Sequence, residues 1–212
     1  MLDAVDRTPA DVVALTGDYM THPGDEVHAA RALRDLLGAV RSRHGVFGVF
    51  GNHDSPRFKA WARGLAGVEW LENRCADLEH MVVLGASEPE DLFSARLGHP
   101  APGRFTLGLA HTPSALFAAA DLGVDVILLG HTHGGQVRVG ARWIGYTAGE
   151  VPGALANGMV RRGGTLACIT RGVGVGRIRL RVNCPMQAPV YTLRRGAMMG
   201  TGRGGCERVL AW

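Results

Sequence analysis

The sequence predicts an α/β domain with a mixed, two-layered β-sheet core flanked by helices. Short apolar runs alternate with helical patterns before residue 137, and strand-like segments dominate from residue 137 to residue 193. With 212 residues, of which 46% are hydrophobic, the chain is long enough to bury a core of its own. We therefore expect one domain over residues 1–195 and a glycine-rich, disordered tail over residues 196–212.

Five apolar runs have the length and composition of buried strands. We expect these strands at residues 11–15, 45–50, 81–84, 105–110 and 124–129. After an acidic first turn, apolar residues at helical spacing predict an amphipathic helix over residues 25–43, whose apolar face holds Val27, Ala30, Leu33, Leu36, Leu37 and Val40. Shorter helices are predicted after Ser55 and Pro56 and over residues 113–120, since proline fits the first turn of a helix. Neighbouring strands in such an order present their carboxyl ends along one edge.

Composition excludes several classes of protein. The net charge of +4 is mild and its arginines are concentrated late in the chain, which indicates a general attraction to anionic substrates or lipid surfaces, with solvated strand faces as the alternative. No aromatic residues are interleaved with them, so we expect no nucleic-acid partner. The cysteines include no CxxC pair and favour neither a zinc ribbon nor a disulfide framework. No signal peptide or membrane span is recognisable.

Polar residues follow four of the predicted strands. They are Asp18, then Asn52, His53 and Asp54, then His111, and finally His131 and His133. Oxygen and nitrogen donors of these types suit manganese, iron or zinc. Taken singly, they have simpler explanations: an aspartate in a turn, a core histidine, two surface histidines, or a helix N-cap for Asp54. Together, at neighbouring strand ends, they predict a metal-binding crevice.

The motifs TGD (16–18), GNHD (51–54), AH (110–111) and GHTHGGQ (130–136) resemble the calcineurin-like metallophosphoesterase superfamily. The stretch 169–195 further resembles its bacterial branch of YkuE- and YaeI-type phosphodiesterases, some of which act on a lipid A precursor. This resemblance implies a phosphodiesterase or pyrophosphatase with two divalent metal ions that activate a hydroxide. A nucleotide-linked or lipid-linked phosphoester is the expected substrate. We expect the protein in the cytoplasm or peripheral to the inner membrane.

The resemblance also implies roles for single residues. The implied metal ligands are Asp18, Asn52, His111, His131 and His133. Asp18 would bridge both metals, and His133 would belong to the first metal. His53 would assist the departing oxygen, and Asp54 would orient the ring of His53.

The family's opening Asp-x-His motif occurs nowhere in this sequence. Glu26 and His28 have similar spacing but lie in a predicted helix, where a solvated face is expected. We therefore expect that an N-terminal strand is missing and that the first metal keeps only Asp18 and His133. The alternative to an active enzyme is a catalytically impaired fragment with at most one metal site. A basic nucleic-acid-binding module is a third class, which would show salt-dependent DNA affinity.

Overall fold

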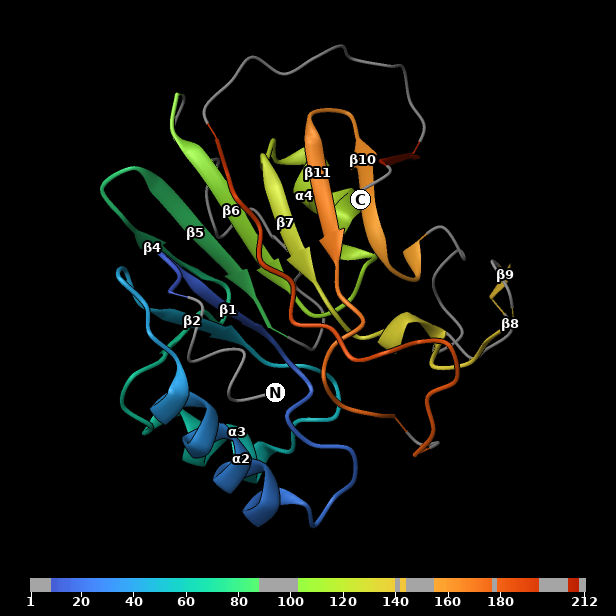
Figure 1. The fold of residues 1–212 in the computed structure, drawn as a ribbon. Coiled ribbons are helices and arrows are strands. Elements are labelled where there is room, and N and C mark those ends of the chain that lie inside the picture. Colours follow the sequence, from blue (N-terminus) through green and yellow to red (C-terminus); the bar gives the residue numbers. More distant parts are fainter. Residues whose placement is uncertain are drawn as a thin grey trace.

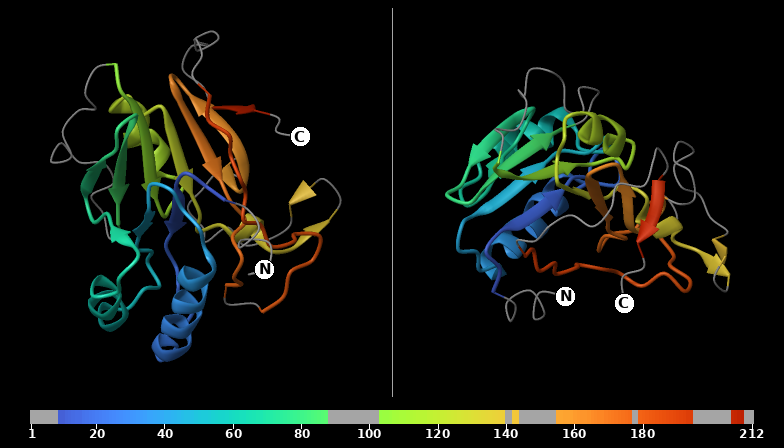
Figure 2. Two further views of the ribbon diagram at one scale, coloured as in Figure 1. Left: turned by 60° about the vertical axis from the view of Figure 1, so that its left-hand side comes forward. Right: turned by 90° about the horizontal axis from the view of Figure 1, so that it is seen from above.

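Two stacked β-sheets form the centre of the molecule (Figure 1, Figure 2). The computed structural model describes residues 9–87, 103–139, 142–143, 155–176, 179–194 and 206–209. The smaller sheet contains three parallel strands, β1 (Val13–Thr16), β2 (Val46–Val49) and β3 (Glu69–Trp70). In the larger sheet the order is β12 (Cys206–Val209), β10 (Gly158–Arg162), β11 (Thr165–Ile169), β7 (Val126–Leu129), β6 (Phe105–Ala110), β5 (Met81–Ala86) and β4 (Arg74–Asp77).

The larger sheet is mixed, as the sequence predicts. The strands β5, β6, β7 and β11 run parallel, whereas β4, β10 and β12 pair antiparallel to their neighbours. Alternate residues of these strands face opposite layers, so Leu109 packs between the two sheets while Ala110 packs on the side of helix α4 (Ala115–Asp121). Because both faces are covered, the strands read as continuous apolar runs.

Two further helices cover the outer face of the smaller sheet (Figure 1). Helix α2 (Glu26–Ala39) begins where predicted but ends four residues earlier than expected, and Val27, expected on its inner face, is exposed. Helix α3 (Pro56–Arg63) begins after Ser55, whose side chain accepts a hydrogen bond from the backbone N–H of Phe58 at 3.1 Å. The molecule therefore has the layer order helix, sheet, sheet, helix.

The region after β11 differs from the prediction of strands up to residue 193. Residues 170–176 and 179–194, here called the irregular segment, contain neither helix nor strand. Glycines at 172, 174 and 176 and prolines at 185 and 189 explain this, because glycine weakens a strand and proline cannot donate to its ladder. Short pairings after β7 are the hairpin of β8 (Arg138–Val139) with β9 (Arg142–Trp143) and an isolated bridge between Val137 and Val182.

Both ends of the chain carry predictions that lie mainly outside the described residues. The expected loss of an N-terminal strand falls before residue 9. In the stretch predicted as a disordered tail, Cys206–Val209 form β12 beside β10, and the rest is not described. Within the described residues, no helix has the length and apolarity needed to cross a membrane.

Candidate metal centre

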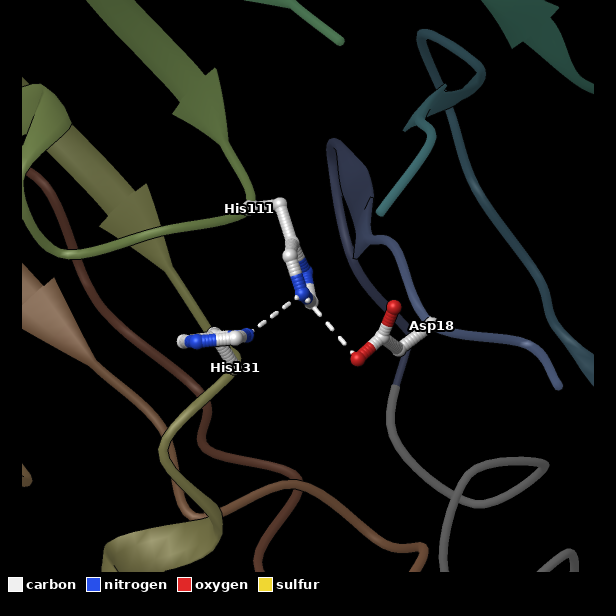
Figure 3. A group of neighbouring side chains, drawn as sticks. All are labelled: Asp18, His111 and His131. Carbon is white, nitrogen blue, oxygen red and sulfur yellow. Dashed lines mark hydrogen bonds and ion pairs between the residues drawn. The ribbon is translucent and has the colours of Figure 1, made fainter. Parts of the chain in front are cut away.

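The ends of three strands from both sheets bring three candidate ligands together (Figure 3). Asp18 follows β1, His111 follows β6 directly, and His131 follows β7. Their ligand atoms all lie within 4.8 Å of one another. The carboxyl ends of parallel strands meet at one edge, which explains how residues far apart in sequence come to share a site.

His111 is the centre of this group. Its ring is buried, and its Nδ1 lies 2.7 Å from the backbone oxygen of Thr16, which can only accept a hydrogen bond. The proton of a neutral ring is therefore on Nδ1, and Nε2 presents a lone pair. That lone pair faces Asp18 Oδ2 at 3.1 Å, Asn52 Oδ1 at 3.1 Å and His131 Nδ1 at 3.0 Å.

This donor set fits a metal ion. A single ring nitrogen can donate at most one hydrogen, yet three lone-pair atoms surround Nε2 of His111. A cation between them would satisfy all four atoms at once. Ligands bound at roughly 2.0–2.2 Å from a metal are about 3–3.5 Å apart, which agrees with the separations from Nε2. Asn52 thus joins the group through its amide oxygen.

Without a metal ion, the electrostatics of the group favour a proton on His111, where the cation would otherwise bind. Burial alone lowers the pKa of His111, but the hydrogen bond and charge of Asp18 outweigh it and raise this pKa above its ordinary value. Burial raises the pKa of Asp18, and His111 together with the backbone N–H of His53 lowers it overall. Burial and the nearby His111 lower the pKa of His131 to about 4. His131 is therefore neutral and offers its Nδ1 lone pair.

Asp54 holds the two loops that carry Asp18 and Asn52. Its buried carboxylate accepts hydrogen bonds from the backbone N–H groups of Gly51 at 2.8 Å, Asp18 at 3.0 Å and Tyr19 at 2.7 Å. Burial raises the pKa of Asp54, and the negative charge of Asp18 raises it further. The hydrogen bond from the backbone N–H of Gly51 lowers this pKa but does not cancel the increase. Its alternative role as a helix N-cap is wrong, because Ser55 caps α3.

His53 lies beside the group with an exposed side chain. Its backbone N–H donates to Asp18 Oδ1 at 3.0 Å. Among the described residues, the carboxylate of Asp54 bonds to backbone N–H groups rather than to the ring of His53. The implied orienting role of Asp54 therefore stays a prediction, and bracing of the loops is the role that its contacts indicate.

His133 stands outside the three-residue group. It lies in a short 3₁₀ turn (His133–Gly135), and Arg181 Nη2 is 3.4 Å from its Nδ1. Burial and the charge of Arg181 lower the pKa of His133. The same guanidinium donates to the backbone oxygens of His133 at 3.1 Å and Arg171 at 2.7 Å. No local sequence pattern predicts this contact, because 48 positions separate Arg181 from His133.

Backbone strain is concentrated in the loops of the site. Asp18, His131 and His133 have φ angles of 57°, 68° and 50°, in a region that residues with a Cβ rarely occupy. Each such residue costs on the order of 1–3 kcal/mol and persists only where its surroundings hold it. Gly17 allows the close approach that this requires, since a Cβ there would lie 2.6 Å from the backbone nitrogen of Gly51.

We expect Asp54→Asn to destabilise the protein by about 2–4 kcal/mol, because hydrogen bonds to a charged group contribute about 1.5–3 kcal/mol each and the new amide NH₂ would face N–H donors. Urea unfolding measures the loss. Asp35→Asn, on the exposed side of α2, is the matched control and should change stability by about 0.5 kcal/mol or less. Equal stability of Asp54→Asn and the parent would refute the bracing role.

Comparisons with known proteins find one family and three curated relatives. The family model of calcineurin-like phosphoesterases matches residues 1–135. Metallophosphoesterase YkuE of Bacillus subtilis is 24% identical over 205 residues, covering 90% of this chain and 70% of that protein. Phosphodiesterase YaeI of Escherichia coli is 29% identical over 196 residues, covering 86% of this chain and 70% of that protein. Metallophosphoesterase YkoQ of B. subtilis is 29% identical over 146 residues, covering 61% of this chain and 52% of that protein.

No solved structure matches the chain significantly. The family match, however, covers more than half of the chain and contains every strand end that contributes to the group around His111. By this match the chain belongs to the calcineurin-like phosphoesterases, a family of phosphoester hydrolases.

Proposed function

We propose that the protein hydrolyses phosphodiesters with the aid of a divalent metal ion bound by Asp18, Asn52, His111 and His131. The observation that carries this proposal is the convergence of lone-pair atoms on Nε2 of His111 (Figure 3). When bound, divalent ions supply an activated water and positive charge that offsets the charge of the phosphoryl oxygens. Manganese, iron and zinc all suit this mixture of oxygen and nitrogen donors.

The protein's own residues keep the negative charge of the site low. Asp18 is the one carboxylate in the group of candidate ligands, while Asn52 and the two histidines are neutral donors. An anionic phosphodiester is therefore not repelled from the site. The role that we propose for His53, whose side chain is exposed and whose backbone contacts Asp18, is to give a proton to the departing alkoxide.

The number of tightly bound metals distinguishes two candidate functions. The described residues form one group of ligands, with His133 outside it. In addition, Asp18 Oδ1 accepts a hydrogen bond from the backbone N–H of His53, which would make this oxygen a weaker ligand for a second metal ion. These contacts favour one tight metal. They also support a second candidate function, a protein that binds one metal but turns over substrate poorly.

Metal titration followed by calorimetry, with hydrolysis of bis(4-nitrophenyl) phosphate, tests the proposal. We expect one Mn²⁺ or Zn²⁺ per chain and hydrolysis that EDTA abolishes. His111→Ala should weaken metal binding by about 100-fold or more, because it removes the nitrogen that the other ligands surround. His28→Ala, on the exposed side of α2, is the matched control.

The outcomes of this experiment are distinct. Hydrolysis that survives both EDTA and His111→Ala would refute the proposed site. Metal binding at one ion per chain without hydrolysis would favour the second candidate function, and two tight ions would show that further residues complete the centre.

His53→Ala separates turnover from metal binding. We expect unchanged metal content and a fall in kcat of about 10²- to 10⁴-fold on an unactivated diester, which is the usual contribution of a general acid. The loss should be smaller on the nitrophenyl ester, because its leaving group needs little protonation. If both esters lose the same factor, His53 does not act on the leaving group.

Metal affinity should depend on pH through His111. In the metal-free protein the raised pKa of His111 keeps Nε2 protonated below that pKa, and metal binding must release this proton. We expect the apparent Kd to rise about tenfold for each pH unit below the pKa of His111 and to level off above it. His131 adds no competition near neutrality, since its pKa is about 4. Calorimetry in buffers of different ionisation enthalpy from pH 6 to 9 counts the released proton, and an affinity that does not change with pH would contradict this expectation.

A further inference from the structure

The irregular segment exposes an unusual share of the protein's large apolar side chains. Six of the eight that are exposed among the described residues belong to it: Val173, Leu180, Val182, Met186, Val190 and Leu193. The exposed fractions reach 53% at Leu180, 59% at Met186 and 68% at Val190. Single exposed apolar residues are ordinary, but such a concentration in one surface segment marks a surface for interaction.

The segment also lies in the most cationic part of the chain. Residues 151–206 contain nine arginines and no aspartate, glutamate or lysine, although the whole chain carries a net charge of only +4. Arg179 and Arg194 are exposed next to Leu180 and Leu193, and neither has a hydrogen bond or ion pair with the described residues. A segregation of charge of this kind indicates an anionic partner.

Not every arginine of the segment is available to a partner. Arg181 is engaged inside the protein, where its guanidinium donates to the backbone oxygens of Arg171 at 2.7 Å, His133 at 3.1 Å and Cys184 at 3.2 Å. These bonds fix the course of the chain around Arg181. The charge offered to a partner therefore comes from Arg179 and Arg194.

The irregular segment is fastened to the loop that carries His131 and His133. The backbone N–H of Val182 donates to the oxygen of Gln136 at 2.8 Å, and that of Gly176 donates to Gln136 Oε1 at 2.5 Å. On the other side, Thr21 Oγ1 donates to the oxygen of Val175 at 3.3 Å. Figure 1 shows the segment, in orange to red, continuing beyond the ends of β7 and β11 and then crossing in front of the larger sheet near β6 and β7. A partner bound to the part of the segment around Val182 would therefore lie beside the loop that carries His131 and His133.

We propose that the irregular segment docks on an anionic lipid surface, with its aliphatic and thioether side chains in the interface and Arg179 and Arg194 on lipid phosphates. Apolar burial and arginine attraction to anionic lipids act together in interfacial binding. Nucleic acid fits less well, because the described part of the segment holds one aromatic ring, Tyr191, and it packs on the core between the sheets. Docking itself does not require the proposed function. If both hold, a phosphoester in the lipid surface would lie near the site that hydrolyses it.

Vesicle co-sedimentation with the full chain tests the docking. We expect binding to vesicles of phosphatidylcholine with phosphatidylglycerol, and little to phosphatidylcholine alone or in high salt. Each arginine near an anionic membrane contributes about a fivefold effect, so Arg179→Gln/Arg194→Gln should weaken binding roughly 25-fold. Leu180→Asn/Met186→Asn/Val190→Asn should weaken it by on the order of tenfold or more, through lost apolar burial.

Val27→Asn/Arg31→Gln is the matched control, since Val27 is 76% exposed and Arg31 is exposed on α2, away from the segment. It should bind vesicles as the parent does, and urea unfolding should show that all variants are folded. Absence of binding to anionic vesicles, equal binding to neutral ones, or binding that both segment variants retain would overturn the proposal. So would retention by nucleic acid or an acidic protein without vesicle binding.

The result is independent of the metal centre. Vesicle binding needs no turnover, so intact docking without hydrolysis of a soluble diester would defeat the proposed function alone. Hydrolysis of that diester without vesicle binding would refute only the proposal that the segment docks on a lipid surface.

Discussion

The meeting of the two sheets at His111 is the interaction on which the site depends. The imidazole comes from the end of β6 in the larger sheet, is 1% exposed, and bonds to Thr16 and Asp18 at the end of β1 in the smaller sheet. One buried ring thus connects the layers and orients a lone pair toward their common edge. The hydrogen bond to Thr16 fixes the tautomer, which is the usual way in which a protein prepares a histidine for a metal.

The strained loops around His111 are held by contacts that do not belong to the candidate ligands. Asp54 ties the loop after β1 to the loop after β2, and Arg181 ties the irregular segment to the turn that contains His133. Strain of this kind persists where surrounding bonds outweigh it. Precise placement of the ligands is therefore a property of the whole strand edge and its loops.

The fold and the candidate ligands were largely predictable, because the strand ends are recognisable from apolar runs followed by polar residues. The five predicted strands and three helices have counterparts in the structure. Val27 was misplaced because the buried side of α2 follows Ala29 and Leu33, and a residue two positions before Ala29 points elsewhere. Apolar spacing alone did not resolve that rotation.

Contacts made by long-range partners could not be predicted in the same way. Asp54 accepts hydrogen bonds from residues 35 and 36 positions away, and Arg181 donates to a residue 48 positions away. No local sequence pattern predicts contacts over such separations. The irregular segment was misread for another reason. Its alternating valines and arginines suit strands, but its glycines and prolines prevent a continuous ladder.

A ligand set drawn from both sheets has a consequence for folding. The proposed metal would cross-link the two layers, since Asp18 follows a strand of one sheet and His111 and His131 follow strands of the other. An ion that binds only the assembled pair of sheets stabilises it by mass action, about 2.7 kcal/mol at 100 times its Kd. The concentration of free metal in the cell would then add to the stability that the apolar core between the sheets provides, before any substrate arrives.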